Sequence, residues 1–185
     1  MLVIITIIRG LCGGSLISPR HILSAYHCTY NHKNDTGDVP CDHSDGTRLA
    51  VLGLHTFTTR NLHSYYTIPI IDVKYPPNQK LDKSDDNSHD LAMLILKEPA
   101  VFSQNVRPIC LPNPNEDFSE QKATAAGWGR TATPDVSKRQ SKVLKSVKLT
   151  VSTKKYKHEK MFGTRLLKVQ NEYQDPCSGD SGIIC

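Results

Sequence analysis

The stretch CGGSLISPRHILSAYHC, residues 12–28, contains two short runs rich in apolar residues, separated by Ser18, Pro19 and Arg20. Serine and proline are common turn residues. The stretch therefore predicts a β-hairpin with one cysteine on each arm. A histidine, His27, directly precedes the second cysteine.

Apolar segments on both sides of this hairpin have the composition of further strands. Residues 1–8 are apolar and β-branched, which favours a buried strand over the apolar core of a signal peptide. Residues 49–54 are also apolar, and residues 70–75 alternate apolar with polar side chains, as a half-buried strand does. Long amphipathic helical patterns are scarce, and Gly and Pro are scattered through the chain. The expected fold class is therefore all-β.

Composition and charge narrow the class of protein. With 185 residues, of which 38% are hydrophobic, the chain is long enough to bury a core. The formal charge of +5 is mildly basic and says nothing about the fold. Six cysteines among many loop residues indicate an oxidising compartment, so we expect a secreted, extracellular protein. The apolar runs are too short to span a bilayer, so no membrane partner is expected.

A serine flanked by glycines lies near the carboxyl end, in the stretch CSGDSG, residues 177–182. A serine hydroxyl is a poor nucleophile unless a base accepts its proton and the developing oxyanion is stabilised. Glycines on both sides allow a sharp turn that presents backbone N–H groups to an oxyanion. The alternative is an ordinary surface turn, since Gly, Ser and Asp are turn residues. A catalytic role for Ser181 therefore requires a base and a carboxylate elsewhere in the chain.

Asp90 is a carboxylate that could orient such a base. It is followed at once by an apolar run, residues 91–96, which predicts an aspartate at the mouth of a buried strand. A buried carboxylate requires a strong hydrogen-bond partner, and an imidazole N–H is one. The alternative is an aspartate in a turn at the edge of a strand.

These segments resemble the trypsin-like (chymotrypsin-family) serine proteases. Residues 12–28 are similar to the cysteine-bridged hairpin that carries the catalytic histidine in that family, and Gly-Trp-Gly at residues 127–129 matches a motif early in its second barrel. The resemblance implies that His27 is the general base, that Asp90 orients it and that Ser181 is the nucleophile. The order His-Asp-Ser is that of chymotrypsin, the type member, and differs from the orders in subtilisins and α/β-hydrolases.

The resemblance also implies a fold and a substrate class. We expect two antiparallel β-barrels, the first formed by residues 1–108, with the connector and an incomplete second barrel in residues 109–185. Asp175 would lie at the base of the specificity pocket and select protein or peptide substrates with Arg or Lys before the cleaved bond. The backbone N–H groups of Gly179 and Ser181 would form the oxyanion hole.

The resemblance assigns partners to only some of the cysteines. It implies a disulfide between Cys12 and Cys28, which the chain-entropy estimate values at about 3 kcal/mol. In the family, the cysteine corresponding to Cys110 bonds to a light chain or propeptide, so a missing segment of that kind is one potential partner. Cys177 and Cys185 are not expected to form the family's pairs.

No cofactor and no metal site are expected. Cys41 and His43 lie among carboxylates, but no matching pair of soft ligands occurs elsewhere, and a bridge from Cys41 to Cys110 stays open. Leu54 stands where calcium-binding family members have their first acidic ligand. Asn34 begins an N-glycosylation sequon, Asn-Asp-Thr, in a polar segment that suits a secreted protein.

Two stretches, residues 137–148 and 154–160, are rich in lysine. A polyanion surface is one interpretation. Because aromatic residues are not interleaved with the lysines and no nucleic-acid motif occurs, a solvated loop and strand face is favoured, and no nucleic-acid partner is expected.

Departures from the family bear on the expected function. Tyr26 stands where the family has a small residue before the histidine, so its ring requires local repacking. Residues 1–185 lack the activation peptide, whose cleavage frees the N-terminal ammonium that shapes the oxyanion hole, and the tail after Cys185. We therefore expect a serine endopeptidase that is inactive, or nearly so, as residues 1–185 alone. The alternatives are a non-catalytic homologue that binds partners and a fragment of an active enzyme.

Overall fold

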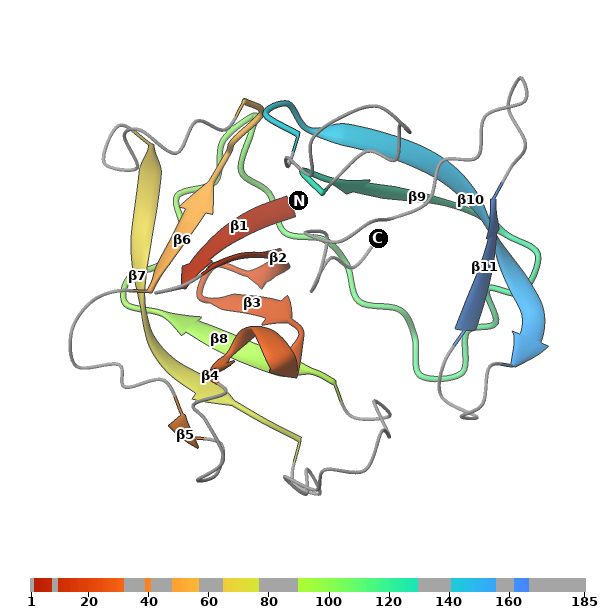
Figure 1. Cartoon of the computed structure of the whole chain (residues 1–185), viewed down its shortest axis with the longest axis horizontal. Coiled ribbons are helices and arrows are strands. Elements are labelled where there is room, and N and C mark those ends of the chain that lie inside the picture. The colour runs from red at the N-terminus through yellow and green to blue at the C-terminus, as the bar shows by residue number, and fades with distance from the viewer. Residues whose placement is uncertain are drawn as a thin grey trace.

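The computed structural model describes eight ranges of the chain: residues 2–7, 10–31, 39–40, 48–56, 65–76, 90–129, 141–155 and 162–166. Within these ranges the chain consists of β-strands and one short 3₁₀ helix, η1 (Tyr26–Cys28), with no α-helix. The strands form a closed barrel, a three-stranded sheet and a two-stranded sheet (Figure 1). The all-β prediction is confirmed.

Six strands close into an antiparallel barrel in the order β1-β2-β3-β8-β7-β6. Closure leaves no strand edge unpaired, so the barrel presents no open ladder to other chains. The bounds of these strands are β1 (Leu2–Ile7), β2 (Gly10–Ser18), β3 (His21–Ser24), β6 (Leu49–Leu52), β7 (Tyr66–Lys74) and β8 (Ala92–Leu96).

The hairpin predicted for residues 12–28 is formed by β2 and β3, with Leu16 opposite Ile22. Its turn is stabilised by the Ser18 side chain, whose Oγ lies 2.6 Å from Nδ1 of His21. The backbone then leaves β3 and enters η1 directly, so the position of η1 follows from the pairing of the hairpin.

The core of the barrel is apolar and is supplied by alternate residues of its strands. In β8 the residues at positions 92, 94 and 96 are buried while those between them are only partly so, as expected for a period of two. The side chains of Leu16, Ile22, Ile68 and Leu94 are almost completely buried in one cluster. Each such burial contributes about 1.5–3 kcal/mol to the folded state.

The strand expected over residues 49–54 ends at Leu52 because the next residue turns the chain. Gly53 has φ of +71°, a left-handed conformation that side chains rarely adopt. A Cβ at this position would also lie only 3.2 Å from Cγ2 of Val106. The sequence pattern of the apolar run does not reveal this turn.

The described residues of the second half of the chain form an open antiparallel sheet in the order β11-β10-β9, with β9 (Lys122–Gly127), β10 (Lys145–Lys155) and β11 (Phe162–Leu166). This agrees with the expected incomplete second barrel. A separate two-stranded sheet pairs β4 (Tyr30–Asn31) with β5 (Val39–Pro40).

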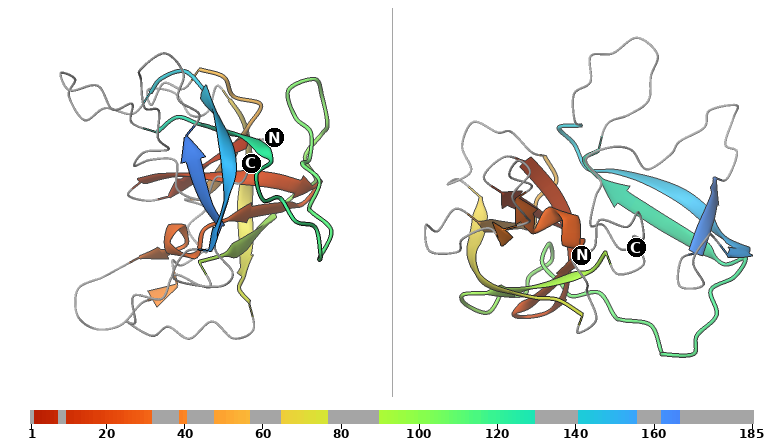
Figure 2. Two further views of the ribbon diagram at one scale, coloured as in Figure 1. Left: turned by 90° about the vertical axis from the view of Figure 1, so that its right-hand side faces the viewer. Right: turned by 60° about the horizontal axis from the view of Figure 1, so that its bottom comes forward.

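The connector, residues 97–121, runs from the barrel to the three-stranded sheet (Figure 2). Its first part lies against the barrel, because the backbone N–H of Ala100 donates to the Pro19 carbonyl at 2.7 Å and that of Ile109 to the Leu16 carbonyl at 2.8 Å. Trp128, directly after β9, is buried against Val51 of β6, so barrel and sheet share a small apolar cluster. No helix in the described part of the chain is long and apolar enough to cross a membrane.

Candidate active site

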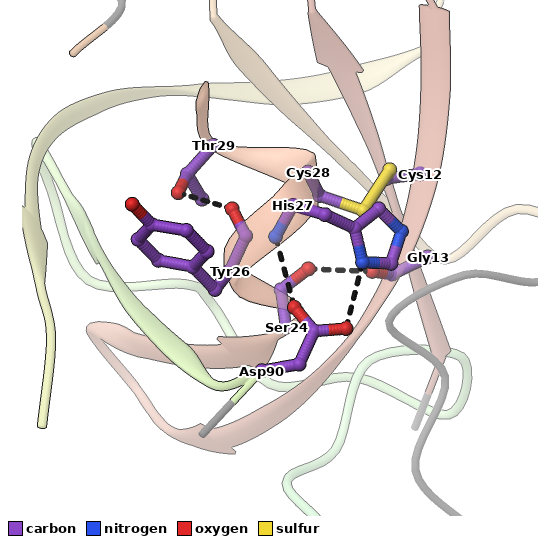
Figure 3. Close-up of a disulfide and its surroundings, with 8 residues drawn as sticks. All are labelled: Cys12, Gly13, Ser24, Tyr26, His27, Cys28, Thr29 and Asp90. Atoms are coloured by element: carbon purple, nitrogen blue, oxygen red, sulfur yellow. Dashed lines mark hydrogen bonds and ion pairs between the residues drawn. A yellow bond between two sulfur atoms is a disulfide. The ribbon is translucent and has the colours of Figure 1, made fainter. Parts of the chain in front are cut away.

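His27 lies in η1, at the end of the predicted hairpin. The next residue, Cys28, is joined by a disulfide to Cys12 of β2, with the two Cα atoms 6.1 Å apart (Figure 3). Close by, the buried Ser24 hydroxyl donates a hydrogen bond to the Gly13 carbonyl at 2.9 Å. The hydrogen bond ties β3 to β2 before His27, and the disulfide ties η1 to β2 after it, so the backbone that carries His27 is held at both ends.

Asp90 is brought to His27 by the pairing of β3 with β8. Ser24 is opposite Ala92 in this register, so the residue two positions before Ala92 reaches the start of η1. Asp90 then accepts two hydrogen bonds from His27. The ring Nδ1 donates to Oδ2 at 2.7 Å, and the backbone N–H donates to Oδ1 at 2.9 Å (Figure 3).

The two hydrogen bonds fix both the tautomer and the orientation of the imidazole. With Nδ1–H held by the carboxylate, the neutral ring carries its lone pair on Nε2. The second ring nitrogen points away from Asp90 in Figure 3, and the His27 side chain is 48% exposed. The ring can therefore accept a proton from a group outside the described part of the site.

Each partner shifts the pKa of the other. The hydrogen bond to Asp90 raises the pKa of His27 above its ordinary value of 6.5; burial opposes this rise, and the charge of Asp90 adds to it. For Asp90, burial is the largest single effect and raises its pKa. The hydrogen bonds and charge of His27, together with a backbone hydrogen bond from Tyr26, outweigh burial, so the pKa of Asp90 lies below its ordinary value of 3.8.

Three residues behind η1 support its conformation. Thr29 Oγ1 donates to the Tyr26 carbonyl at 2.7 Å and lies 3.1 Å from the Tyr75 hydroxyl. Nη2 of Arg48 donates to the Thr29 carbonyl at 2.7 Å. Arg48 is only 4% exposed, and among the described residues its Nε and Nη1 have no hydrogen-bond partner. A buried guanidinium with so few hydrogen-bond partners lowers the stability of the fold. Its hydrogen bond to the Thr29 carbonyl therefore links this buried charge directly to the segment that follows η1.

The sequence alone does not mark Arg48, Thr29 or Tyr75 as part of the site. The available signal is a charged residue directly before the apolar run at residues 49–54, but nothing local indicates what it contacts.

The repacking expected around Tyr26 takes a definite form. Its ring packs edge-to-face on Tyr75, with centroids 5.2 Å apart and an interplanar angle of 71°, a favourable geometry for an aromatic pair.

Of the residues predicted for the site, the structure brings together His27, Asp90, Cys12 and Cys28. The sulfurs of Cys12 and Cys28 lie within 4.8 Å of a His27 nitrogen, but sulfurs joined in a disulfide are not the thiolates that bind metals. Cys110 is exposed and has a free thiol. Several predicted residues lie outside the described ranges: Asn34, Cys41, His43, Asp175, Cys177, Gly179, Ser181 and Cys185.

Comparison with known proteins gives a consistent result. The family model described as Trypsin matches residues 2–182. A venom serine protease of Polistes dominula is 32% identical over 183 residues, which cover 92% of this chain and 58% of that protein. Phenoloxidase-activating factor 1 of Holotrichia diomphalia is 28% identical over 190 residues, which cover 92% of this chain and 48% of that protein. The chain thus spans about half the length of these curated relatives.

Among solved structures, human heparin binding protein superposes with a TM-score of 0.71 at 24% identity. The match covers 98% of this chain and 72% of that protein. At this identity the likeness concerns the fold, and it supports the arrangement of barrel, connector and second sheet.

Proposed function

The chain belongs to the trypsin family of serine proteases, and from this premise we propose that it is the catalytic region of a secreted endopeptidase that cleaves after Arg or Lys. The observation that carries the proposal is the His27–Asp90 pair, with two hydrogen bonds and a half-exposed imidazole. A general base in this family's chemistry requires that combination, since one ring nitrogen must be held and the other must reach the nucleophile.

In the proposed reaction, Ser181 Oγ attacks the carbonyl carbon of the scissile bond while Nε2 of His27 accepts the hydroxyl proton. Asp90 keeps the imidazole in the required tautomer and stabilises the imidazolium. The C–N bond breaks as His27 returns the proton to the leaving amine, which leaves an acyl-enzyme. Water then attacks the acyl-enzyme with the same transfer of a proton through His27, releasing the carboxylic acid and restoring Ser181.

Two further roles rest on the family and on sequence position. The backbone N–H groups of Gly179 and Ser181 stabilise the oxyanion, where one donor is worth about 10²–10³ in rate. Asp175 selects the substrate, because a carboxylate in a pocket stays uncompensated unless a cationic side chain enters it.

The proposal extends to the setting in which the enzyme acts. The disulfide between Cys12 and Cys28 suits an oxidising, extracellular environment, and the sequon at Asn34 suits glycosylation. The exposed free thiol of Cys110 supports a disulfide to a propeptide or light chain. Such a second chain would stay attached after the activating cleavage.

A fluorophosphonate probe, which reacts with activated serines, tests the catalytic assignment in the full-length activated protein. We expect stoichiometric labelling at Ser181, lost in Ser181→Ala and strongly reduced in His27→Ala. The labelled protein should also cleave Arg and Lys peptides, and Asp175→Ser should reduce that cleavage by orders of magnitude while labelling persists. A folded protein that shows no labelling would instead be a non-catalytic homologue that binds partners.

A further inference from the structure

Positive charge is distributed very unevenly along this chain. Residues 121–170 contain 13 of its 23 lysines and arginines but only 2 of its 18 aspartates and glutamates. The rest of the chain is therefore net acidic, and the overall charge of +5 conceals a strongly basic second half. Such asymmetry is a physical indication of an anionic partner rather than a property of the fold.

The structure gathers part of this charge on the three-stranded sheet. The strands β9, β10 and β11 contain Lys122, Lys145, Lys148, Lys154, Lys155 and Arg165 and no aspartate or glutamate. Lys122, Lys145 and Lys148 are exposed, and so is Lys142 just before β10. In the right-hand view of Figure 2 this sheet lies to one side of the barrel.

The register of β9 and β10 places two of these lysines on one face. Lys148 is opposite Thr124 and Thr150 is opposite Lys122, so the two lysines are diagonal neighbours, about 7–8 Å apart for standard strand geometry. The opposite face carries Leu149, which is 4% exposed. We call the polar side the lysine face; its members are Lys122, Thr124, Ser146, Lys148 and Thr150.

The lysine face continues toward β11. Thr150 is paired on its other side with Arg165, so a third basic residue occupies the register position beside it. Neighbouring strands lie about 4.8 Å apart, which places the backbone of Arg165 about 10 Å from that of Lys122. Three basic positions thus fall within a short distance across the width of the sheet.

No described carboxylate neutralises the exposed lysines of this region. The one lysine of the described chain that forms an ion pair is on the barrel, where Lys74 Nζ lies 2.6 Å from Asp72 Oδ2. Lys122, Lys142, Lys145 and Lys148 have no such partner among the described residues. Like charges on adjacent strands repel and destabilise the sheet. A bound polyanion would offset this repulsion, because its negative charges attract each lysine.

We propose that the lysine face binds a linear sulfated polysaccharide. Lysine ammonium groups act as mobile point charges that suit sulfates spaced along a flexible chain. Single-stranded nucleic acid instead requires aromatic side chains for base stacking; the one aromatic side chain described in this sheet region, Trp128, is buried. The disulfide of the barrel indicates an extracellular setting, where sulfated polysaccharides are an abundant class of polyanion.

The test measures binding of heparin, as the sulfated probe, to the full-length protein over a range of salt concentrations. The variant Lys122→Glu/Lys148→Glu should weaken binding at least about tenfold at physiological salt and reduce the number of counterions released by about two. The matched control, Arg20→Glu/Lys97→Glu, makes the same change in net charge at exposed positions of the barrel side. It should change affinity by less than about threefold.

Competition separates the classes of polyanion. Desulfated heparin, single-stranded DNA of equal charge and phosphatidylserine vesicles should compete poorly with heparin. Equal loss of affinity in the two double variants would overturn the proposal, because net charge alone would then explain binding. Tighter binding of DNA or of vesicles would overturn it in favour of that partner. Circular dichroism of both variants establishes that each is folded.

Discussion

At the scale of single residues, the His27–Asp90 pair couples protonation to structure. The pKa of His27 lies above 6.5, so protonated His27 stabilises the fold below that pH, and this contribution is lost as the pH rises through the raised pKa. The pKa of Asp90 lies below 3.8, so ionised Asp90 stabilises the fold above that pH, and this contribution is lost as the pH falls through the lowered pKa. Both contributions are present together between pH 3.8 and 6.5.

Replacing Asp90 by Asn should lower the pKa of His27 toward 6.5, because the hydrogen bond to the carboxylate is the main cause of its rise. NMR titration of the His27 ring C2 proton measures this directly. Asp72→Asn is the matched control, since its carboxylate pairs with Lys74 and should leave His27 unaffected. An unchanged His27 pKa in Asp90→Asn would contradict the assigned cause.

The same shift has a consequence for the proposed catalysis. A general base must be neutral, so cleavage should increase as the pH rises through the raised pKa of His27. The stability contributed by the pair and the activity of the base therefore change in opposite directions with pH.

At the scale of elements, the disulfide is the connection that sets η1 against β2. Cys12 and Cys28 are separated by 16 residues, and the loop they close includes the whole turn of the hairpin. The adjacent strands β2 and β3 already pair through backbone hydrogen bonds. The disulfide therefore adds most to η1, which is not part of a paired strand.

Replacing both Cys12 and Cys28 by Ala should lower the free energy of unfolding by about 3 kcal/mol, as the chain-entropy estimate gives for a loop of this length. The pKa of His27 should also move toward 6.5, because η1 is less firmly held beside Asp90. Urea unfolding and the same NMR titration measure the two effects. Cys110→Ala, at an exposed free thiol, is the control and should change stability by less than about 0.5 kcal/mol.

At the scale of the whole molecule, barrel and second sheet are joined through a small apolar cluster. Trp128 packs with Val51, and its Nε1–H donates to the His55 carbonyl at 3.1 Å. The backbone N–H of Leu144 donates to the same carbonyl at 2.8 Å. Since Trp128 is the only tryptophan of the chain, its fluorescence reports on this junction.

Val51→Ala should destabilise the junction by about 2 kcal/mol, because it removes two buried methyl groups and leaves a cavity beside Trp128. The denaturant midpoint of the tryptophan fluorescence transition should decrease accordingly. Val101→Ala removes the same groups from a side chain that is 71% exposed, and its midpoint should not change measurably. Equal effects of the two substitutions would show that the cluster does not hold the junction.

Sequence patterns were sufficient for features that depend on neighbouring residues. The alternation in residues 70–75, the apolar run after Asp90 and the turn at Pro19 predict strands and a hairpin because strand periodicity and turn geometry are local properties. Family resemblance, rather than spacing, supplied the pairing of Cys12 with Cys28, since nothing local specifies which thiols meet. The turn at Gly53 was missed because an apolar run continues on both sides of it.

Only the tertiary structure decided which distant residues meet. His27 and Asp90 are 63 residues apart, and the pairing of β3 with β8 brings them into contact. Arg48, directly before β6, donates to the carbonyl of Thr29, directly after η1, although the two residues are 19 positions apart. The lysine face likewise exists only through the register of β9 with β10. A strand can be predicted from the alternation of its own residues. Contacts between strands depend instead on barrel closure and register, which are set by many weak burial and hydrogen-bond interactions acting together.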